Sequence, residues 1–135
     1  GLQAIMKYFI CIFTLIFTLF SSTNQSLSEG NSKRGESMFQ VHCQACHTTS
    51  EGIGYKVGPN LFGVFGAKAG QRDYSFERHY SRALKQSKII WNEKNLHYFL
   101  ENPKGFLPGT KMPFVGFRNK KDRDHIITYL KKISP

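Results

Sequence analysis

The feature that most limits the folds open to this chain is the pentapeptide Cys43-Gln44-Ala45-Cys46-His47. Two thiols at this spacing, followed directly by a histidine, are typical of covalent haem attachment, because the thiols meet two vinyl groups and the histidine reaches the iron. A zinc site needs four ligands, and the chain has no second cysteine pair. A thioredoxin-type redox pair needs a βαβ pattern around it, which is not visible. A disulfide between Cys43 and Cys46 stays open as an alternative.

Two long stretches without a hydrophobic period support the haem interpretation. They run from Thr48 to His79 and from Lys104 to Arg118, and both are rich in glycine or proline. Loops of this length are uncommon in a compact domain, and barely a hundred residues with so much loop bury little apolar surface. A haem wrapped by these loops would supply the missing core.

Three segments have the apolar spacing of helices. One covers 33–42. A second starts at a cap on Asn92 and stops at Asn102-Pro103, and its inward face is Leu96, Phe99 and Leu100. A third covers 122–132, with an acidic start and two lysines at its end that match the helix dipole. No run alternates as a strand, so the sequence predicts an all-α fold.

The first thirty residues form a separate segment. Lys7 is followed by an apolar run that ends at Phe20, and then by small polar residues. This layout is typical of a secretory signal peptide, and the run is shorter than the roughly 20 residues that span a bilayer. We therefore expect residues 1–30 to be a signal peptide, or a retained membrane anchor, plus a short linker. A buried core helix is a third reading, and residues 31–135 are expected to form the haem domain.

The second axial ligand of the haem is found by elimination. Beyond the N-terminal segment the methionines are Met38 and Met112. Met38 belongs to the helix that leads into the motif, on the wrong side to reach the opposite haem face, whereas Met112 lies on a loop that can fold over it. Ligation by His47 and Met112 fills both axial positions and leaves only electron transfer. Bis-histidine ligation through His79 or His97 remains an alternative.

The formal net charge of +10 predicts anionic partners. A nucleic-acid-binding module is not favoured, because the chain lacks a basic helix or an interleaved aromatic platform. A five-coordinate redox enzyme, such as a peroxidase, is the other alternative, for the case in which Met112 does not bind the iron.

Short stretches between 35 and 133 resemble one known family. They are Gly35-x-x-x-Phe39, Cys43-Gln-Ala-Cys-His-Thr48, Gly58-Pro-Asn-Leu61, Phe65-Gly66, Ile89-Ile-Trp91, Tyr98-Phe-Leu-Glu-Asn-Pro103, Pro108-Gly-Thr-Lys-Met-Pro-Phe-Val-Gly116 and Tyr129-Leu-Lys-Lys132. In this combination the chain resembles the class I c-type cytochromes, that is, mitochondrial-type cytochromes c and bacterial cytochromes c2.

The resemblance implies a fold in which the N- and C-terminal helices cross, with Gly35 and Phe39 packed on Ile126 and Tyr129, and with Gly/Pro-rich loops around the haem. It implies one haem c, bound covalently through Cys43 and Cys46, with His47 and Met112 on the iron. The implied contacts around the haem and its ligands come from Pro59, which accepts a hydrogen bond from His47, from Tyr80, Trp91 and Thr110 at the propionates, and from Phe99 and Phe114 beside Met112.

The chain departs from the family at three places. An arginine near the propionates is replaced by Ala67, a tyrosine beside the ligand methionine is Phe99, and the loop between Gln71 and Tyr80 is longer than in the animal proteins. None of these changes touches ligation, and all could alter the reduction potential.

The function implied is that of a monohaem single-electron carrier, not an enzyme, in a respiratory chain. The protein would carry electrons from a quinol-oxidising cytochrome bc1-type complex to a terminal oxidase or peroxidase. A basic rim would meet their acidic docking faces, and a monomer is expected. The rim residues are Lys56, Lys104, Lys111, Arg118, Lys120 and Lys121.

The apolar run decides the expected compartment. Mitochondrial cytochromes c lack a segment like 7–20, so we expect the bacterial periplasm, with the protein soluble or tethered to the inner membrane through that run. The mitochondrial intermembrane space is the alternative.

Overall fold

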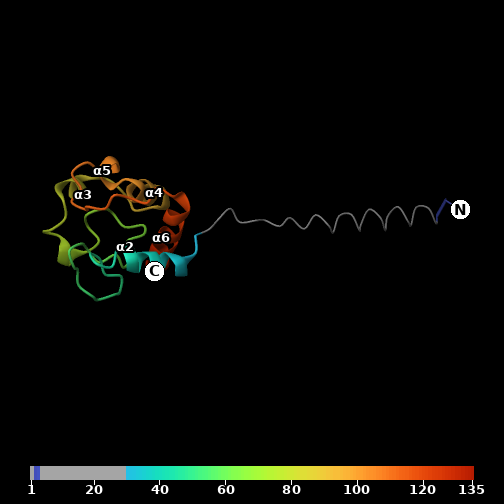
Figure 1. The fold of residues 1–135 in the computed structure, drawn as a ribbon, viewed down its shortest axis with the longest axis horizontal. Coiled ribbons are helices and arrows are strands. Elements are labelled where there is room, and N and C mark those ends of the chain that lie inside the picture. Colours follow the sequence, from blue (N-terminus) through green and yellow to red (C-terminus); the bar gives the residue numbers. More distant parts are fainter. Residues whose placement is uncertain (1, 4–29) are drawn as a thin grey trace.

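A computed structural model describes residues 2–3 and 30–135 of the chain (Figure 1). The predicted signal peptide or anchor, with its apolar run at 7–20, lies outside the described residues, apart from 2–3 and Gly30. Within the described ranges, no helix is both long enough and apolar enough to cross a membrane.

The described part of the chain is helical, which confirms the all-α prediction. The only pairing of strand type within it is an isolated bridge between Lys68 and Ile90. The helices are α2 (Ser32–His42), the 3-10 turn η1 (Tyr74–Phe76), α3 (Arg82–Gln86), α4 (Glu93–Glu101), α5 (Pro103–Phe106) and α6 (Lys120–Lys132).

Asparagine side chains begin the three main helices. Asn31 accepts a hydrogen bond from the backbone of Arg34, and Asn92 accepts one from Asn95, both at 2.9 Å. Asn119 starts α6 two residues before the predicted position by accepting from the Lys121 backbone. Each side chain satisfies a backbone N–H that has no partner inside its own helix.

Helices α2 and α6 pack closely, as predicted (Figure 1). The contact is close because residue 35 is glycine: a Cβ atom there would overlap the carbonyl oxygen of His125. One turn later the rings of Phe39 and Tyr129 lie 5.6 Å apart, centre to centre. Gly35 lies against His125 and Tyr129, and Phe39 lies in the core together with the predicted partners Ile126 and Tyr129.

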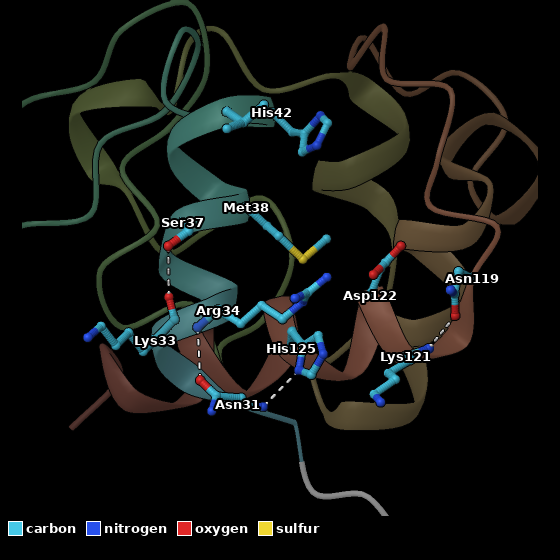
Figure 2. A pocket seen from close by; sticks show the side chains of 11 residues that line it. Asn31, Lys33, Arg34, Ser37, Met38, His42, Asn119, Lys121, Asp122 and His125 are labelled. Atoms are coloured by element: carbon cyan, nitrogen blue, oxygen red, sulfur yellow. Dashed lines mark hydrogen bonds between the residues drawn. The ribbon is translucent and has the colours of Figure 1, made fainter.

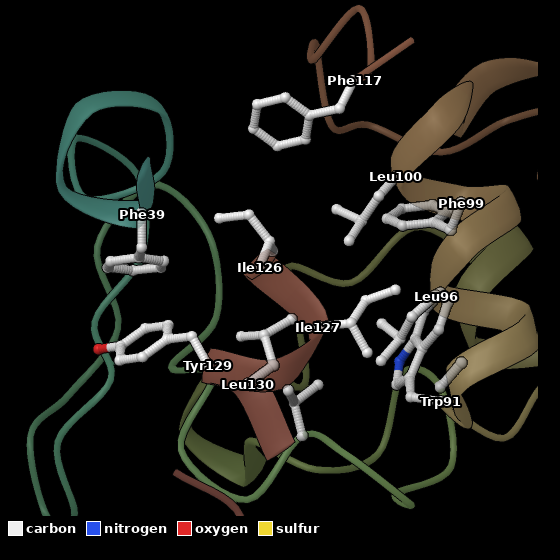
Figure 3. Close-up of a cluster of buried hydrophobic side chains, with 12 residues drawn as sticks. Phe39, Trp91, Leu96, Phe99, Leu100, Phe117, Ile126, Ile127, Tyr129 and Leu130 are labelled. Atoms are coloured by element: carbon white, nitrogen blue, oxygen red, sulfur yellow. The ribbon is translucent and has the colours of Figure 1, made fainter. Parts of the chain in front are cut away.

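The hydrophobic core gathers where α2, α4 and α6 meet (Figure 3). Helix α4 contributes the predicted face, and the ring of its Phe99 lies 4.8 Å from that of Trp91. The rest of the domain consists of the long segments and short helices, which curve around one side of this core. The core residues are Phe39, Val64, Ala69, Trp91, Leu96, Phe99, Leu100, Phe117, Ile126, Ile127, Tyr129 and Leu130.

The short helices η1, α3 and α5 were not expected. Turn η1 lies in the stretch 48–79, and α5 begins one residue before the stretch 104–118. Asn102 explains the predicted stop after α4, because its side chain caps α5 by accepting from the Gly105 backbone at 3.0 Å. Pro103 is the first residue of α5, a position where a missing N–H costs nothing.

Candidate functional site

A cavity of about 650 Å³ lies between the core and the long loops. All ten residues predicted to touch the haem line its wall, although they come from both long loops and from segments around α2 and α4. They are Cys43, Cys46, His47, Pro59, Tyr80, Trp91, Phe99, Thr110, Met112 and Phe114.

The cavity suits a large, flat, mostly apolar group with negatively charged substituents. Protein interiors rarely leave voids much larger than a water molecule, so a mainly apolar cavity of this size in a small domain calls for a resident group. Its wall is mainly aliphatic and aromatic, and its charged side chains Lys68, Arg72 and Lys111 are all basic. A haem, with an apolar ring and two carboxylates, fits both properties.

His47 is held in one orientation from two sides. Its Nδ1 lies 2.8 Å from the carbonyl oxygen of Pro59, and since a carbonyl only accepts, Nδ1 carries the proton. Gly58 packs against the ring, where a Cβ atom would overlap the imidazole. Burial lowers the pKa of His47, although the hydrogen bond to Pro59 acts in the opposite direction. The ring is therefore neutral at pH 7 with Nε2 unprotonated, which is the form that binds a metal.

Cys43 and Cys46 are free thiols, so the disulfide considered above is not formed. Burial, and then the neighbouring Cys46, raise the pKa of Cys43 to about 11. Across 2–3 and 30–135 no group of three or more His, Cys, Asp or Glu side chains is placed to hold a metal ion by itself.

Two of the four candidates for the second axial ligand line the cavity, and two do not. Met112 lines the cavity, whereas Met38 lines a separate, open groove on the outside of α2 and α6 (Figure 2). His97 does not line the cavity, because its Nε2 faces the carboxylate of Asp124 at 3.1 Å. His79 does line it, and its Nε2 lies 3.3 Å from the hydroxyl of Tyr55.

The remaining predicted residues form the wall around these groups. The Tyr80 hydroxyl accepts a hydrogen bond from the Asp73 backbone at 3.2 Å, and burial raises the pKa of Tyr80, so the phenol stays protonated. Thr110 accepts from the backbone of Met112 at 3.4 Å. Phe114 packs edge-on against Phe117 with ring centres 4.9 Å apart.

Sequence reasoning missed several residues of the cavity wall. Phe76 on η1 and Leu84 on α3 line it, as do the basic residues Lys68 and Arg72. None belongs to a motif or a periodic stripe. The only signal was the extra length of the loop between Gln71 and Tyr80, which carries two of them.

The residues of the predicted basic rim are all exposed, but some of them have polar partners within the chain. Lys120 is paired with Asp124 at 3.0 Å, and Lys56 donates to the backbone carbonyl of Gln44 at 2.6 Å. Lys104 and Arg118 form no ion pair within the described chain.

Comparison with known proteins gives one consistent result. The family model for cytochrome c matches residues 32–134. A cytochrome c of Theileria parva is 44% identical over 108 residues, which is 80% of this chain and 90% of the relative. A cytochrome c of Stellaria longipes is 46% identical over 102 residues (76% and 92%), and one of Kluyveromyces lactis is 43% identical over 105 residues (77% and 92%).

The match spans nearly all of the described residues, including the attachment motif and the loops that surround the cavity. The chain therefore belongs to the cytochrome c family: it carries one haem c, attached through Cys43 and Cys46, and it transfers electrons rather than acting as an enzyme.

Proposed function

We propose that His47 and Met112 are the two axial ligands, and that the protein carries single electrons between a quinol-oxidising cytochrome bc1-type complex and a terminal oxidase or peroxidase. The observation that carries this proposal is the fixed His47 imidazole, whose unprotonated Nε2 shares one cavity with the Met112 thioether. With both positions filled, no place remains for oxygen or peroxide.

The chain contributes orientation and exclusion of water. Pro59 and Gly58 fix the ring of His47, and the segment 108–116 carries Met112 to the cavity wall. Haem supplies the one-electron chemistry. Buried aromatic rings around it, such as Trp91 and Phe99, lower the local polarity and keep solvent reorganisation small during electron transfer.

The ligand assignment is tested by carbon monoxide binding to the reduced holoprotein, followed in the visible spectrum. We expect no binding to the parent protein, and binding to Met112→Ala, because that substitution opens the position. Met38→Ala is the matched control, since Met38 lies in the outer groove, and it should behave like the parent. Binding of carbon monoxide by the parent would overturn the assignment.

The partners are proposed from charge. Exposed Lys104, Lys111 and Arg118 lie on the stretch 104–118, which includes Met112, and could meet acidic faces of the electron donor and acceptor while keeping the complexes short-lived. A monomer is sufficient for this role, and we propose no nucleic-acid partner.

We propose the mitochondrial intermembrane space as the compartment. The relatives named above come from an apicomplexan, a plant and a yeast, so they give no support to the bacterial periplasm predicted from the apolar run. The family match begins at residue 32 and leaves the predicted signal peptide or anchor untested. Fractionation of source cells decides the question: recovery with intermembrane-space markers is expected, and recovery from a bacterial periplasm would contradict it.

A further inference from the structure

Arg72 is a half-buried cation in the wall of the haem cavity. Its Nε–H donates to the carbonyl oxygen of Gly63 at 3.2 Å. The guanidinium lies against the backbone at this point, where a Cβ atom on Gly63 would overlap it, and Gly63 has a positive φ of 73°. A side chain at position 63 would therefore displace the arginine.

The loop that carries Arg72 is fixed by its neighbour Asp73. The carboxylate of Asp73 accepts hydrogen bonds from the backbones of Asn60 at 2.8 Å and Ser75 at 3.0 Å, while its own N–H donates to the hydroxyl of Tyr80. Burial acts against ionisation of Asp73, but hydrogen bonds from the Ser75 hydroxyl and from the backbones of Asn60, Phe76 and Ser75 together hold its pKa below the usual value. Asp73 thereby keeps Arg72 close to Tyr80. Burial raises the pKa of Tyr80, and the positive charge of Arg72 acts in the opposite direction.

Arg72 has no anionic partner among the described residues. No carboxylate there lies within 4.0 Å of its guanidinium nitrogens, and the wall of the cavity contains no Asp or Glu. A partly buried charge is costly unless it is paired. The other ionisable groups of the wall are not carboxylates: His42, Cys43, Cys46, His47, Lys68, His79, Tyr80 and Lys111.

We propose that Arg72 forms an ion pair with a propionate carboxylate of the haem. A guanidinium is suited to this contact because its planar N–H groups match the two oxygens of a carboxylate. The hydrogen bond to the Gly63 carbonyl holds the guanidinium in place before the haem binds. Arg72 would provide a fixed cation at a site where Ala67 supplies none. This proposal goes beyond the proposed function, because it concerns the isolated holoprotein and involves neither redox partners nor compartment.

The ion pair has a consequence for the reduction potential. An ionised propionate stabilises the ferric haem, which carries one more positive charge than the ferrous form, and a cation beside the propionate offsets that stabilisation. Loss of the Arg72 charge should therefore favour the ferric state and lower the potential.

The test compares the potentials of three variants of the purified holoprotein. Arg72→Gln removes the charge and keeps a polar side chain, and Arg72→Lys keeps the charge. Arg78→Gln is the matched control, because Arg78 lies in the same loop but is exposed and does not line the cavity. We expect a clear fall in potential for Arg72→Gln, a smaller one for Arg72→Lys, and almost none for Arg78→Gln.

Two results would overturn the proposal. Equal shifts in Arg72→Gln and Arg78→Gln would mean that only the net charge matters. Equal falls in Arg72→Lys and Arg72→Gln would mean that the shape of the side chain, rather than its charge at the propionate, controls the potential. If Arg72→Gln does not retain haem, the reduction potentials of Arg72→Lys and Arg78→Gln still decide the question. An ion pair between Arg72 and the propionate predicts that the potential falls further in Arg72→Lys than in Arg78→Gln.

Discussion

At position 99 a phenylalanine ring lies in the cavity wall, with its centre 4.8 Å from that of Trp91 and 6.3 Å from that of Phe106. We expect Phe99→Tyr to raise the reduction potential, because a hydroxyl near the Met112 sulfur would weaken its donation to the iron and disfavour the ferric state. If that hydroxyl finds no partner, burying it costs about 1–3 kcal/mol of stability. Voltammetry and denaturant unfolding measure the two effects, and an unchanged or lowered potential would mean that residue 99 does not act on the sulfur.

At the scale of elements, the contact of α2 with α6 depends on the missing side chain of Gly35. We expect Gly35→Ala to lower the free energy of unfolding by about 1–3 kcal/mol, because the methyl group would press on the His125 carbonyl and push the helices apart. Gln40→Ala, on the exposed side of α2, is the control and should change stability by no more than about 0.5 kcal/mol. Equal stabilities of the two variants in urea unfolding would contradict this account of the helix contact.

The contact of α4 with α6 should be sensitive to acid. His97 lies 3.1 Å from Asp124 and 3.4 Å from the Nε of Arg123, and burial lowers the pKa of His97 despite the carboxylate. Because the unfolded chain binds this proton more readily than the folded one, the stability that His97 contributes is present above about pH 6.5 and falls as the pH drops below it. Between pH 7 and pH 5 the melting temperature should fall less in His97→Gln than in the parent. Parallel plots of melting temperature against pH would refute the role assigned to His97.

For the molecule as a whole, the long loops have no core of their own without haem. We expect the Cys43→Ala/Cys46→Ala variant to be largely unstructured, because the binding energy of the cofactor is also folding energy. Circular dichroism measures the helix content, and near-native helicity in the haem-free variant would contradict the prediction.

The overall charge leads to a salt prediction. Electron transfer to an acidic partner should slow as ionic strength rises, since the Debye length is only about 8 Å near 0.15 M. Lys104→Glu should slow it more than Lys132→Glu, because Lys104 is on the predicted rim and Lys132 ends α6. Stopped-flow rates at several salt concentrations test this, and equal effects of the two charge reversals would leave only a non-specific attraction.

The sequence predicts those helices whose apolar residues repeat along the chain, and it does not predict helices that depend on a single capping side chain. Helices α2, α4 and α6 were found because their apolar residues repeat with the helical period, although the start of α6 was missed, since it depends on the Asn119 cap. The short helices α3 and α5 and the turn η1 have no period, because they depend on single capping side chains such as Ser81 and Asp73.

The residues of the site also fall into two groups, those that could be named from the sequence and those that could not. The attachment motif and Met112 carry their chemistry in residue type and spacing, so they could be named in advance. Arg72 could not be named, because its place in the wall depends on how Asp73 ties the loop to Asn60 and Tyr80. That arrangement is a property of the folded backbone.

Burial of Cys43 has a consequence for the order of events during biogenesis. Thiolates react much faster than thiols, and with a pKa of about 11 only about one Cys43 side chain in ten thousand is ionised at pH 7. A chain that reached this packing before acquiring its haem would keep the Cys43 sulfur, on which its maturation depends, in the less reactive thiol form. The largely unstructured state expected above for the haem-free chain is therefore an advantage, because it leaves Cys43 in water, with an ordinary thiol pKa, until the bond is made.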